Sequence, residues 1–323
     1  MSVSSEDNSP LGNAADEDVE TRELVILDPN AFDVDVTHSK IGKIEHLEQL
    51  TRCETLCFRT NLIKKIEGLS TLTSLTELDF YDNLLEKIEN LEALTNLENL
   101  DFSYNRLKKI ENLENQTQII NLYLIHNKIA KIENISHMTE MKMLELGDNR
   151  LRVIENIDTM VKLLKLYLGK NKITKIQGLD TFTYLTCLSL QSNRIVKMEG
   201  LDSLVNLQEL YLSDNGIEKI EGLDKNICLS TLDLASNKIK KIENVSHLVE
   251  MEEFWFNDNQ ISNWEDLDEL KTMKQLETVY FERNPIYYDS HQQQWKADPN
   301  YRRKIMLALP WVKQIDATMT KLS

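Results

Sequence analysis

Leucine and isoleucine recur along this chain at fixed distances from an asparagine that returns every 22 residues. This series of ladder asparagines comprises Asn61, Asn83, Asn105, Asn127, Asn149, Asn171, Asn193, Asn215, Asn237 and Asn259. Ser39 holds the same place one period earlier, and Asn284 follows Asn259 after a longer step of 25 residues. The repetition predicts about twelve units stacked in one dimension, each packing only on its neighbours.

Each unit reads LxxLxLxxNxIxKIEGL, as in residues 207–223. The alternation Leu210-x-Leu212 has the period of a strand with one buried face, so the units should pair as a parallel sheet with a strand spacing of roughly 4.8 Å. The ladder asparagine turns the chain out of the strand, and its amide can satisfy backbone groups that the turn would otherwise bury unpaired. Ile220 and Leu223 return to the core from the opposite side. The remaining segment is long enough only for a short 3-10 or α turn on the convex side.

A glycine or asparagine recurs seven positions after a ladder asparagine, where a positive φ or a capped helical turn is expected. These residues are Gly68, Asn90, Asn112, Asn134, Gly178, Gly200, Gly222 and Asn244.

The two ends depart from the period, because the terminal units of a solenoid would otherwise expose core. Residues 1–24 are acidic and polar, and we expect them to be disordered. Residues 25–284 form the solenoid, which begins with a degenerate unit that includes Leu27, Phe32 and Val34. Residues 285–323 carry a helical pattern with aromatic residues such as Trp295 and Trp311, suited to covering the last unit.

Composition narrows the classes of partner. The formal net charge of -16 disfavours nucleic acid and anionic membranes, since both are bound through Lys and Arg, and it favours a basic protein surface. No apolar run approaches the roughly 18 residues that a membrane span needs, and the acidic start lacks the apolar core of a secretory signal. The four cysteines form no CxxC pair, so we expect reduced thiols and a location inside the cell.

The 22-residue unit is a leucine-rich repeat, and it resembles the class typified by the protein phosphatase 1 regulatory subunit 7 family over roughly residues 33–316. The C-terminal stretch resembles the cap of that class in residues 284–287, in Tyr301-Arg302 and in residues 309–316. This cap also occurs in a spliceosomal leucine-rich subunit and in acidic nuclear phosphoproteins. The resemblance implies an α/β solenoid, shaped as a curved rod with a concave parallel β-sheet.

The resemblance also implies a function. Proteins of this family bind the catalytic subunit of protein phosphatase 1 through the concave face and regulate it. We therefore expect a regulatory subunit that is monomeric alone, nuclear and cytoplasmic, and able to join a further regulatory subunit. The alternatives are a nucleoprotein scaffold that binds an RNA-recognition domain, for which about twelve repeats are too many, and a cytoskeletal scaffold.

The residue four positions before each ladder residue lies between two buried strand positions and should point out of the concave face. This concave column reads Asp35, Cys57, Asp79, Asp101, Tyr123, Glu145, Tyr167, Ser189, Tyr211, Asp233, Trp255 and Tyr280. Strand propensity explains some of the aromatic residues, and solubility explains some of the acids. Exposed Tyr and Trp on rigid strands are nevertheless typical of binding hot spots. We expect the partner to be bound by Asp79, Asp101, Tyr123, Glu145, Tyr167, Tyr211, Glu253, Trp255 and Tyr280.

A second column, four positions after each ladder residue, is almost entirely lysine from Lys43 to Lys241. A lysine ladder is compatible with phosphate binding, but a glutamate usually follows two positions later and cancels the charge. We therefore interpret it as a solvated rim whose methylenes cover the core.

Catalytic chemistry has little support. The chain has no HExxH, P-loop or GxSxG motif, and its nine glycines leave little material for phosphate-binding loops. His137 and His247 occupy equivalent places five periods apart, which position in the repeat explains better than catalysis. Asp79 and Asp101 could bind a cation weakly, but a basic patch on a partner meets the same electrostatic need. We expect no enzymatic activity, no metal and no cofactor.

Overall fold

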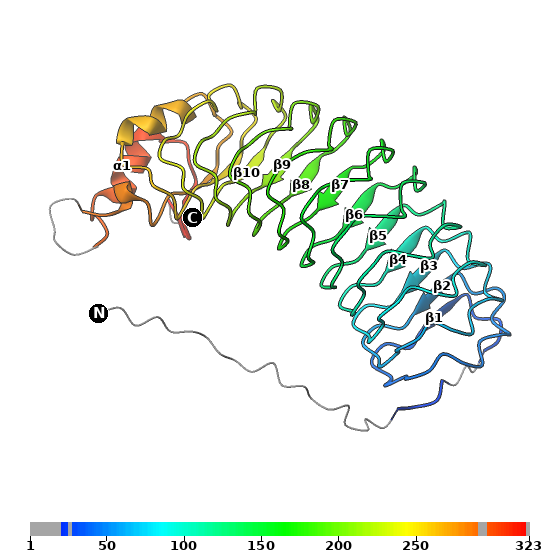
Figure 1. Cartoon of the computed structure of the whole chain (residues 1–323). Coiled ribbons are helices and arrows are strands. Elements are labelled where there is room, and N and C mark those ends of the chain that lie inside the picture. The colour runs from blue at the N-terminus through cyan, green and yellow to red at the C-terminus, as the bar shows by residue number, and fades with distance from the viewer. Residues whose placement is uncertain (1–20, 25–27, 290–295, 321–323) are drawn as a thin grey trace, which may run out of the picture.

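The computed structural model describes residues 21–24, 28–289 and 296–320. The strands stack side by side along a curved arc (Figure 1) and form one sheet in sequence order. Twelve parallel strands of three residues each are β1 (Asp33–Asp35), β2 (Thr55–Cys57), β3 (Glu77–Asp79), β4 (Asn99–Asp101), β5 (Asn121–Tyr123), β6 (Met143–Glu145), β7 (Lys165–Tyr167), β8 (Cys187–Ser189), β9 (Glu209–Tyr211), β10 (Thr231–Asp233), β11 (Glu253–Trp255) and β12 (Thr278–Tyr280). The predicted solenoid with its concave parallel sheet is confirmed.

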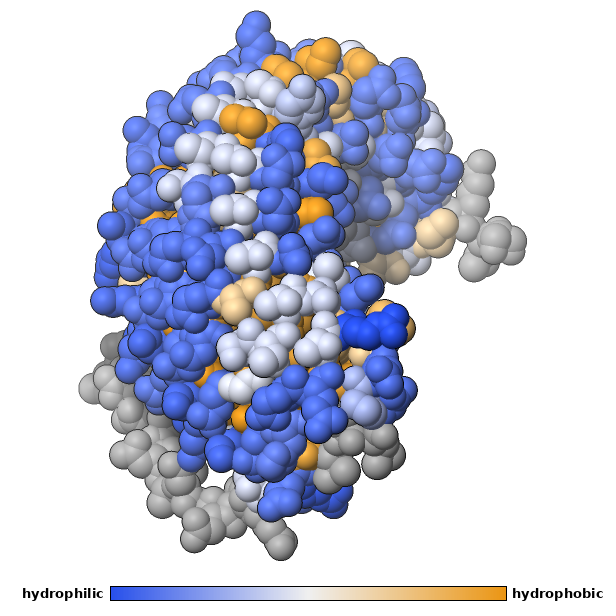
Figure 2. All heavy atoms as spheres, turned by 90° about the vertical axis from the view of Figure 1, so that its right-hand side faces the viewer, coloured by the Kyte–Doolittle hydropathy of each residue, from blue (hydrophilic) through white to orange (hydrophobic). Residues whose placement is uncertain are grey.

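The core runs the length of the arc as stacked columns of identical repeat positions. Leu144 at the centre of β6 and Leu146 just after it are fully buried, as are their counterparts in the neighbouring repeats. Near the N-terminal end the second of these columns is aromatic, with ring centroids 5.3 Å apart for Phe58 and Phe80, and 5.7 Å apart for Phe80 and Phe102. On the face seen in Figure 2, hydrophobic residues lie isolated among hydrophilic ones.

Each ladder asparagine joins its own repeat to the one before it. The Nδ2 atom of Asn149 donates to the carbonyl oxygens of Leu124 (2.8 Å), Leu146 (3.2 Å) and Gly147 (3.0 Å), while its Oδ1 accepts from the backbone N–H of Ile129 (3.0 Å). The same pattern recurs at Asn61, Asn127 and Asn171. The amide therefore satisfies buried backbone groups, as the sequence indicates.

Positive φ angles occur at the predicted places and at a second set that the sequence analysis did not predict. Gly200 has a φ of 68° and Asn112 a φ of 58°. Both follow the seven-position rule, by which the residue seven places after a ladder asparagine has a positive φ. The residue directly before each ladder asparagine is also left-handed, as at Thr60 (φ 53°) and Lys170 (φ 51°). Because these residues are of many types, their conformation left no signal in the composition.

The convex side consists of single turns. The Leu72 N–H donates to the Leu69 carbonyl oxygen (3.0 Å), and the Leu75 N–H donates to that of Leu72 (3.1 Å), which is 3-10 hydrogen bonding over one turn at a time. Among the described residues of the solenoid, a 3-10 helix forms only at η1 (Trp264–Leu270), in the repeat that is 25 residues long.

The N-terminal end departs from the prediction. Residues 1–20 and Leu27 lie outside the described residues, so their predicted structure stays a prediction. Residues 21–24, predicted to be disordered, are instead part of the solenoid. The Arg22 N–H donates to the Lys40 carbonyl oxygen (3.0 Å), and Leu24 is 3% exposed. The reason is that Leu24 covers the otherwise exposed end of the core.

The C-terminal cap continues the sheet. After η2 (Pro285–Tyr287) and α1 (Tyr301–Ala308), β13 (Gln314–Ile315) pairs in parallel with β12, and β14 (Thr318–Met319) folds back antiparallel. Asp316 joins the cap to the last repeat, because its Oδ1 accepts from the N–H groups of Phe281 (2.9 Å) and Glu282 (3.0 Å). Trp295 lies outside the described residues, whereas the Trp311 Nε1 donates to the carbonyl oxygen of Met273 (2.9 Å).

Candidate functional site

The predicted concave column exists as a continuous row of side chains across the sheet, the concave row. Strand register pairs each member with the next, from Asp35 beside Cys57 at one end to Trp255 beside Tyr280 at the other. Because every pairing is parallel and in register, each repeat contributes one side chain to the row. Glu253, the predicted residue outside this row, lies two residues before Trp255 on β11 and points to the same side.

The side chains of the row are less exposed than the sequence analysis expected. Tyr123, Tyr167 and Tyr211 are partly buried, and Ser189 and Asp233 are buried. The physical reason is spacing, because side chains on strands roughly 4.8 Å apart cover one another's flanks. The aromatic residues therefore present edges and polar tips to solvent, held in place by their neighbours.

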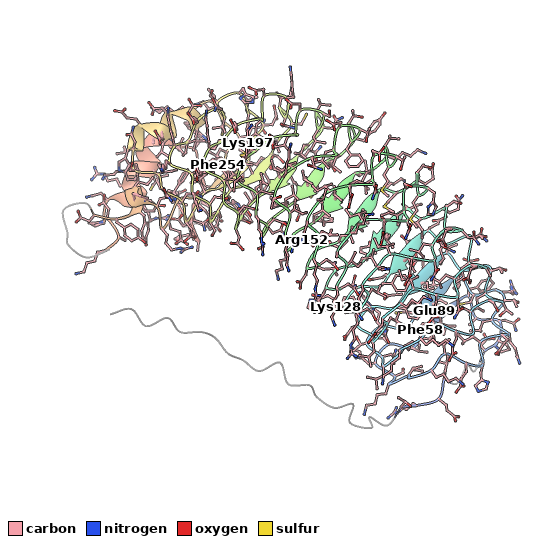
Figure 3. All side chains as sticks on the ribbon, in the orientation of Figure 1. Phe58, Glu89, Lys128, Arg152, Lys197 and Phe254 are labelled. Atoms are coloured by element: carbon pink, nitrogen blue, oxygen red, sulfur yellow. The ribbon has the colours of Figure 1, made fainter. Side chains whose placement is uncertain are left out.

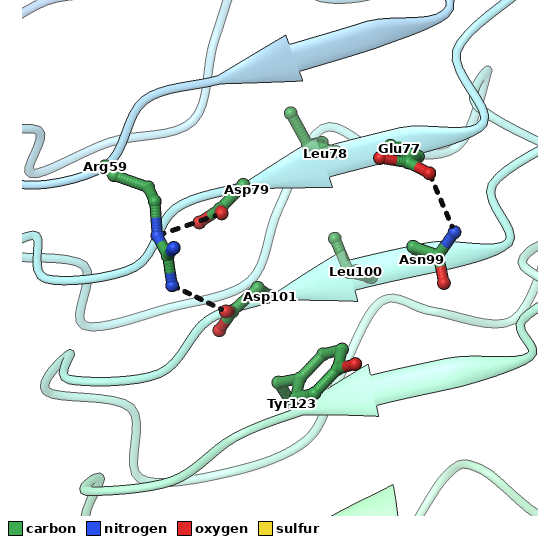
Figure 4. A pocket seen from close by; sticks show the side chains of 8 residues that line it. All are labelled: Arg59, Glu77, Leu78, Asp79, Asn99, Leu100, Asp101 and Tyr123. Atoms are coloured by element: carbon green, nitrogen blue, oxygen red, sulfur yellow. Dashed lines mark hydrogen bonds and ion pairs between the residues drawn. The ribbon is translucent and has the colours of Figure 1, made fainter. Parts of the chain in front are cut away.

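Acidic residues of the row gather at its N-terminal half. Asp79, Asp101 and Tyr123 line a shallow pocket of about 450 Å³ (Figure 4). Its other lining residues are Glu77 and Asn99, which stand two residues earlier on β3 and β4, and Arg59, Leu78 and Leu100. The pocket is therefore built from three consecutive strands, β3 to β5, and from Arg59, which follows β2.

Arg59 is the residue of this site that the sequence analysis missed. Its Nε lies 3.1 Å from Asp79 Oδ2, and its Nη2 lies 3.7 Å from Asp101 Oδ2. The guanidinium also stacks over the ring of Tyr81, 4.3 Å from the centroid. Arg59 stands two positions before its ladder asparagine, so continuing the strand alternation by one step would have placed it on the concave side.

Burial makes these carboxylates costly to ionise. It raises the pKa of Asp79 to about 6 and, with a smaller contribution from Asp101, that of Glu145 to about 7. Burial also raises the pKa of Asp101 and Asp233, against hydrogen bonds that lower it. Desolvation raises the pKa of Asp79 and Asp101 even though Arg59 lies beside them, so a further cationic group brought against these carboxyls would stabilise their ionised form.

The C-terminal half of the row is aromatic and carries hydrogen-bonding tips. The rings of Trp255 and Tyr280 meet edge to face with centroids 5.8 Å apart, and Gln314 of the cap donates to the Tyr280 hydroxyl (2.8 Å). The Trp255 Nε1 is buried without a hydrogen-bond partner among the described residues. The Tyr211 hydroxyl donates to Glu209 Oε2 (3.0 Å). This half therefore presents the edges of aromatic rings together with polar groups held by hydrogen bonds.

A stack of rings borders the acidic half. The Tyr81 and Tyr104 centroids are 4.9 Å apart, and those of Tyr104 and His126 are 4.8 Å apart. The Nδ1 of His126 lies 2.6 Å from Asp148 Oδ2. No pattern in the sequence predicts this stack, because its members differ in residue type and one is offset within its repeat.

Most of the lysine rim is neutralised, as predicted. Lys43 lies 2.7 Å from Glu45, Lys65 3.2 Å from Glu67 and Lys197 3.3 Å from Glu199. The two equivalent histidines are engaged in the fold, since the Nε2 of His137 lies 2.9 Å from the Leu113 carbonyl oxygen and that of His247 lies 3.0 Å from that of Leu223. Within the described part of the chain, no helix is long and apolar enough to cross a membrane.

Comparison with known families agrees with the architecture. A family model described as "Leucine Rich repeats (2 copies)" matches residues 183–225, and one described as "Leucine Rich repeat" matches residues 225–241. The fold of this chain is a leucine-rich-repeat solenoid. The leucine-rich-repeat protein also resembles solved structures, among them an internalin from Listeria monocytogenes (TM-score 0.69, 24% identity, 89% of this chain and 87% of that one). InlJ from the same organism matches with a TM-score of 0.71 at 20% identity, over 90% of this chain and 64% of that one. These likenesses show the fold alone.

Curated relatives match a shorter stretch at higher identity. The leucine-rich-repeat protein is 58% identical to "Protein phosphatase 1 regulatory subunit 7" of Danio rerio over 53 residues, which is 16% of this chain and 13% of the relative. The Homo sapiens protein of that name is 59% identical over 53 residues, or 16% and 12%. A Caenorhabditis elegans "Protein phosphatase 1 regulatory subunit SDS22 homolog" is 50% identical over 46 residues, or 14% and 12%. The aligned stretches thus span about an eighth of each relative, and they confirm the resemblance predicted from the repeat unit.

Proposed function

We propose that this leucine-rich-repeat protein is a non-catalytic regulatory subunit that binds the catalytic subunit of protein phosphatase 1 through its concave column. The observation that carries the proposal is the single row of acidic and aromatic side chains, one per repeat, on an uncovered parallel sheet. Parallel sheets are normally covered on both faces, so an open one with this composition favours a binding surface. The names of the curated relatives support this choice of partner.

The two halves of the row define the partner surface. Opposite Asp79, Asp101 and Glu145 the partner would place Lys or Arg side chains, which would stabilise the ionised carboxylates. Opposite Trp255 it would place apolar groups that pack on the exposed edges of the Trp255 and Tyr280 rings.

The rigidity of the sheet supports tight binding. Its side chains are already held by their neighbours, so little ordering entropy is lost when the complex forms. Twelve strands at roughly 4.8 Å give a face of about 55 Å, which is long enough for the roughly 800 Å² per partner of a standard interface. The proposed complex would form in the nucleus and cytoplasm, and a further regulatory subunit could join it at surfaces outside the concave row.

Calorimetric titration with purified protein phosphatase 1 catalytic subunit tests the proposal. Wild type is compared with Trp255→Ala and Tyr167→Ala, and with Tyr184→Ala as the matched control. Tyr184 is 62% exposed in the turn Phe182–Leu185, away from the concave row. Each concave variant should lose on the order of 2 kcal/mol of binding free energy or more, whereas the control should bind as wild type does. Circular dichroism confirms that the variants are folded.

If folded wild type does not bind the catalytic subunit, the proposed partner is wrong. If wild type binds and both concave variants bind equally well, the partner is retained but the concave row is not the site, and the interface must lie on the rim or the cap.

A further inference from the structure

Basic residues collect on one edge of this acidic protein, just past the end of each strand. Across the ten repeats from Ser39 to Asn237, the positions one, three and four places after the ladder residue hold 20 of the 37 Lys and Arg residues and two glutamates. The chain as a whole carries a formal net charge of -16. Its positive charge is therefore concentrated on this edge, while the rest of the surface is strongly negative.

Two kinds of basic residue must be distinguished on this edge. The lysines four places after the ladder residue are mostly paired with glutamates, as in Lys131–Glu133 (3.8 Å) and Lys241–Glu243 (3.7 Å). A second group, which we call the basic row, makes no ion pair with any described residue: Arg106, Lys128, Arg150, Arg152, Lys172 and Arg194. Five of the six are exposed and Lys172 is partly exposed.

The basic row is continuous. Five of its members stand one place after the ladder asparagine in five consecutive repeats, from Arg106 to Arg194, and Arg152 adds a second charge in the middle repeat. Figure 3 shows Lys128 and Arg152 at the same edge of the arc. At its N-terminal end, Arg106 lines a pocket of about 430 Å³ with Lys64, Lys65 and Lys87, and with Glu86 and Glu89.

Unpaired like charges in neighbouring repeats destabilise the free protein, because their backbone positions are only roughly 5 Å apart and the charges repel. The adjacent lysine column shows that the repeat can neutralise such a row with a glutamate two places later. The basic row lacks this neutralisation over five repeats, which is the arrangement expected of a surface whose counter-charges come from another molecule.

We propose that the basic row binds an acidic, extended peptide segment of a partner protein. Four steps of roughly 4.8 Å separate Arg106 from Arg194, a span of roughly 19 Å that an extended peptide covers with about six residues. Its carboxylates, at alternate residues, lie within reach of the long basic side chains, and the arginines bind carboxylates with two parallel hydrogen bonds.

Charge favours a peptide over a nucleic acid. A nucleic acid would extend its phosphates past the row, toward the glutamates of the rim and the acidic remainder of the surface. A short acidic segment keeps its charge over the row. Its repulsion from the acidic surface farther than roughly 8–10 Å away is screened at physiological salt.

Fluorescence anisotropy with a labelled peptide carrying glutamate at alternate positions, long enough to span five repeats, tests the proposal. The triple variant Arg106→Glu, Arg150→Glu, Arg194→Glu removes the row. The triple variant Lys131→Glu, Lys197→Glu, Lys241→Glu is the matched control, because it changes the net charge equally on the paired column of the same edge. The first variant should weaken binding about tenfold or more, and the control about threefold or less. A peptide with glutamine in place of glutamate should not bind.

Three results would overturn the proposal. If wild type does not bind the acidic peptide at moderate salt, the proposal is wrong. Equal losses in the two variants would show attraction by overall charge without a defined row. If a single-stranded DNA oligonucleotide of equal charge binds more tightly than the peptide, and the first variant abolishes that binding, the row binds nucleic acid. Thermal unfolding followed by circular dichroism confirms that both variants are folded.

Discussion

At the scale of single residues, the ladder asparagine shows why one residue type recurs so strictly. Its position requires both a donor and an acceptor, because the Nδ2 group donates to carbonyl oxygens of two repeats while the Oδ1 accepts a backbone N–H. A carboxylate could only accept there, and a hydroxyl could not reach as many carbonyl groups. The role of the residue is therefore predictable from the sequence, since no other side chain meets the same demand.

Replacing Asn149 with alanine should destabilise the protein strongly. The change leaves the buried Ile129 N–H without a partner. The carbonyl oxygens of Leu124 and Leu146 each lose one of two side-chain donors, because the neighbouring ladder asparagines also donate to them. With about 1–3 kcal/mol for a buried group left unsatisfied, the free energy of unfolding should fall by about 2–3 kcal/mol. Urea denaturation measures this loss.

Asn96→Ala is the matched control, because Asn96 is exposed and makes one hydrogen bond, to the Thr73 carbonyl oxygen (2.9 Å). It should lose about 1 kcal/mol or less. Equal losses in the two variants would contradict the role assigned to the ladder.

Glu145 should make stability depend on pH. Its pKa of about 7 in the folded protein lies above the ordinary value of 4.5, so the folded state binds a proton more tightly than the unfolded state. Stability therefore falls as the pH rises from about 4.5 to about 7, and Glu145→Gln should remove that part of the fall. The unfolding free energy of the variant relative to wild type should rise by on the order of 1–2 kcal/mol between about pH 5 and pH 8.

Urea denaturation at the two pH values measures this difference. The Gly147 N–H donates to Glu145 Oε1 (2.9 Å), a bond that a glutamine oxygen can still accept. Glu86→Gln, on the exposed rim, should leave the pH dependence unchanged. A constant difference between wild type and Glu145→Gln at all pH values would show that burial does not hold this carboxyl protonated.

At the scale of the element, each repeat depends on a turn that only some residues can form. Gly200 has a φ of 68°, and a Cβ placed there would lie 2.7 Å from the Ile176 carbonyl oxygen of the previous repeat. Gly200→Ala should therefore cost about 1–3 kcal/mol, through strain and through the displaced turn. Thermal or urea unfolding of the variant checks this value.

Gly216→Ala is the control for that turn. Gly216 has no positive φ, and the nearest atom to a Cβ there is the Val196 Cγ1 at 3.3 Å, at the end of an exposed side chain. Its stability should stay within about 1 kcal/mol of wild type. If the two glycines respond alike, the turn conformation does not explain the seven-position rule.

Some contacts between elements could not be predicted from the sequence. The strand alternation predicted the concave row, but it did not predict that Arg59 would reach across to Asp79 and Asp101, since that contact depends on a long side chain crossing two strands. The contact between Gln314 and Tyr280 was equally out of reach, because the cap lies outside the period. The partial burial of the concave row could not be predicted either, because each side chain is covered by side chains of the neighbouring repeats.

At the scale of the whole molecule, repetition turns a sequence into surfaces. A residue's distance from its ladder asparagine determines which face it occupies, so the concave row, the lysine rim and the core columns could all be assigned from sequence. The same geometry separates charge on the molecule, with acids and aromatic rings on the concave sheet and unpaired basic side chains along one edge. A single protein can thereby present two surfaces of opposite charge along the same arc.

Photocrosslinking tests the central claim, that the concave row meets the phosphatase catalytic subunit, most directly. A photoreactive phenylalanine analogue replaces Tyr167, Tyr211 or, on the convex-side turn, Tyr184, and each protein is irradiated with the purified catalytic subunit. The account predicts crosslinks from Tyr167 and Tyr211 and none from Tyr184. Crosslinking from Tyr184 alone would contradict it.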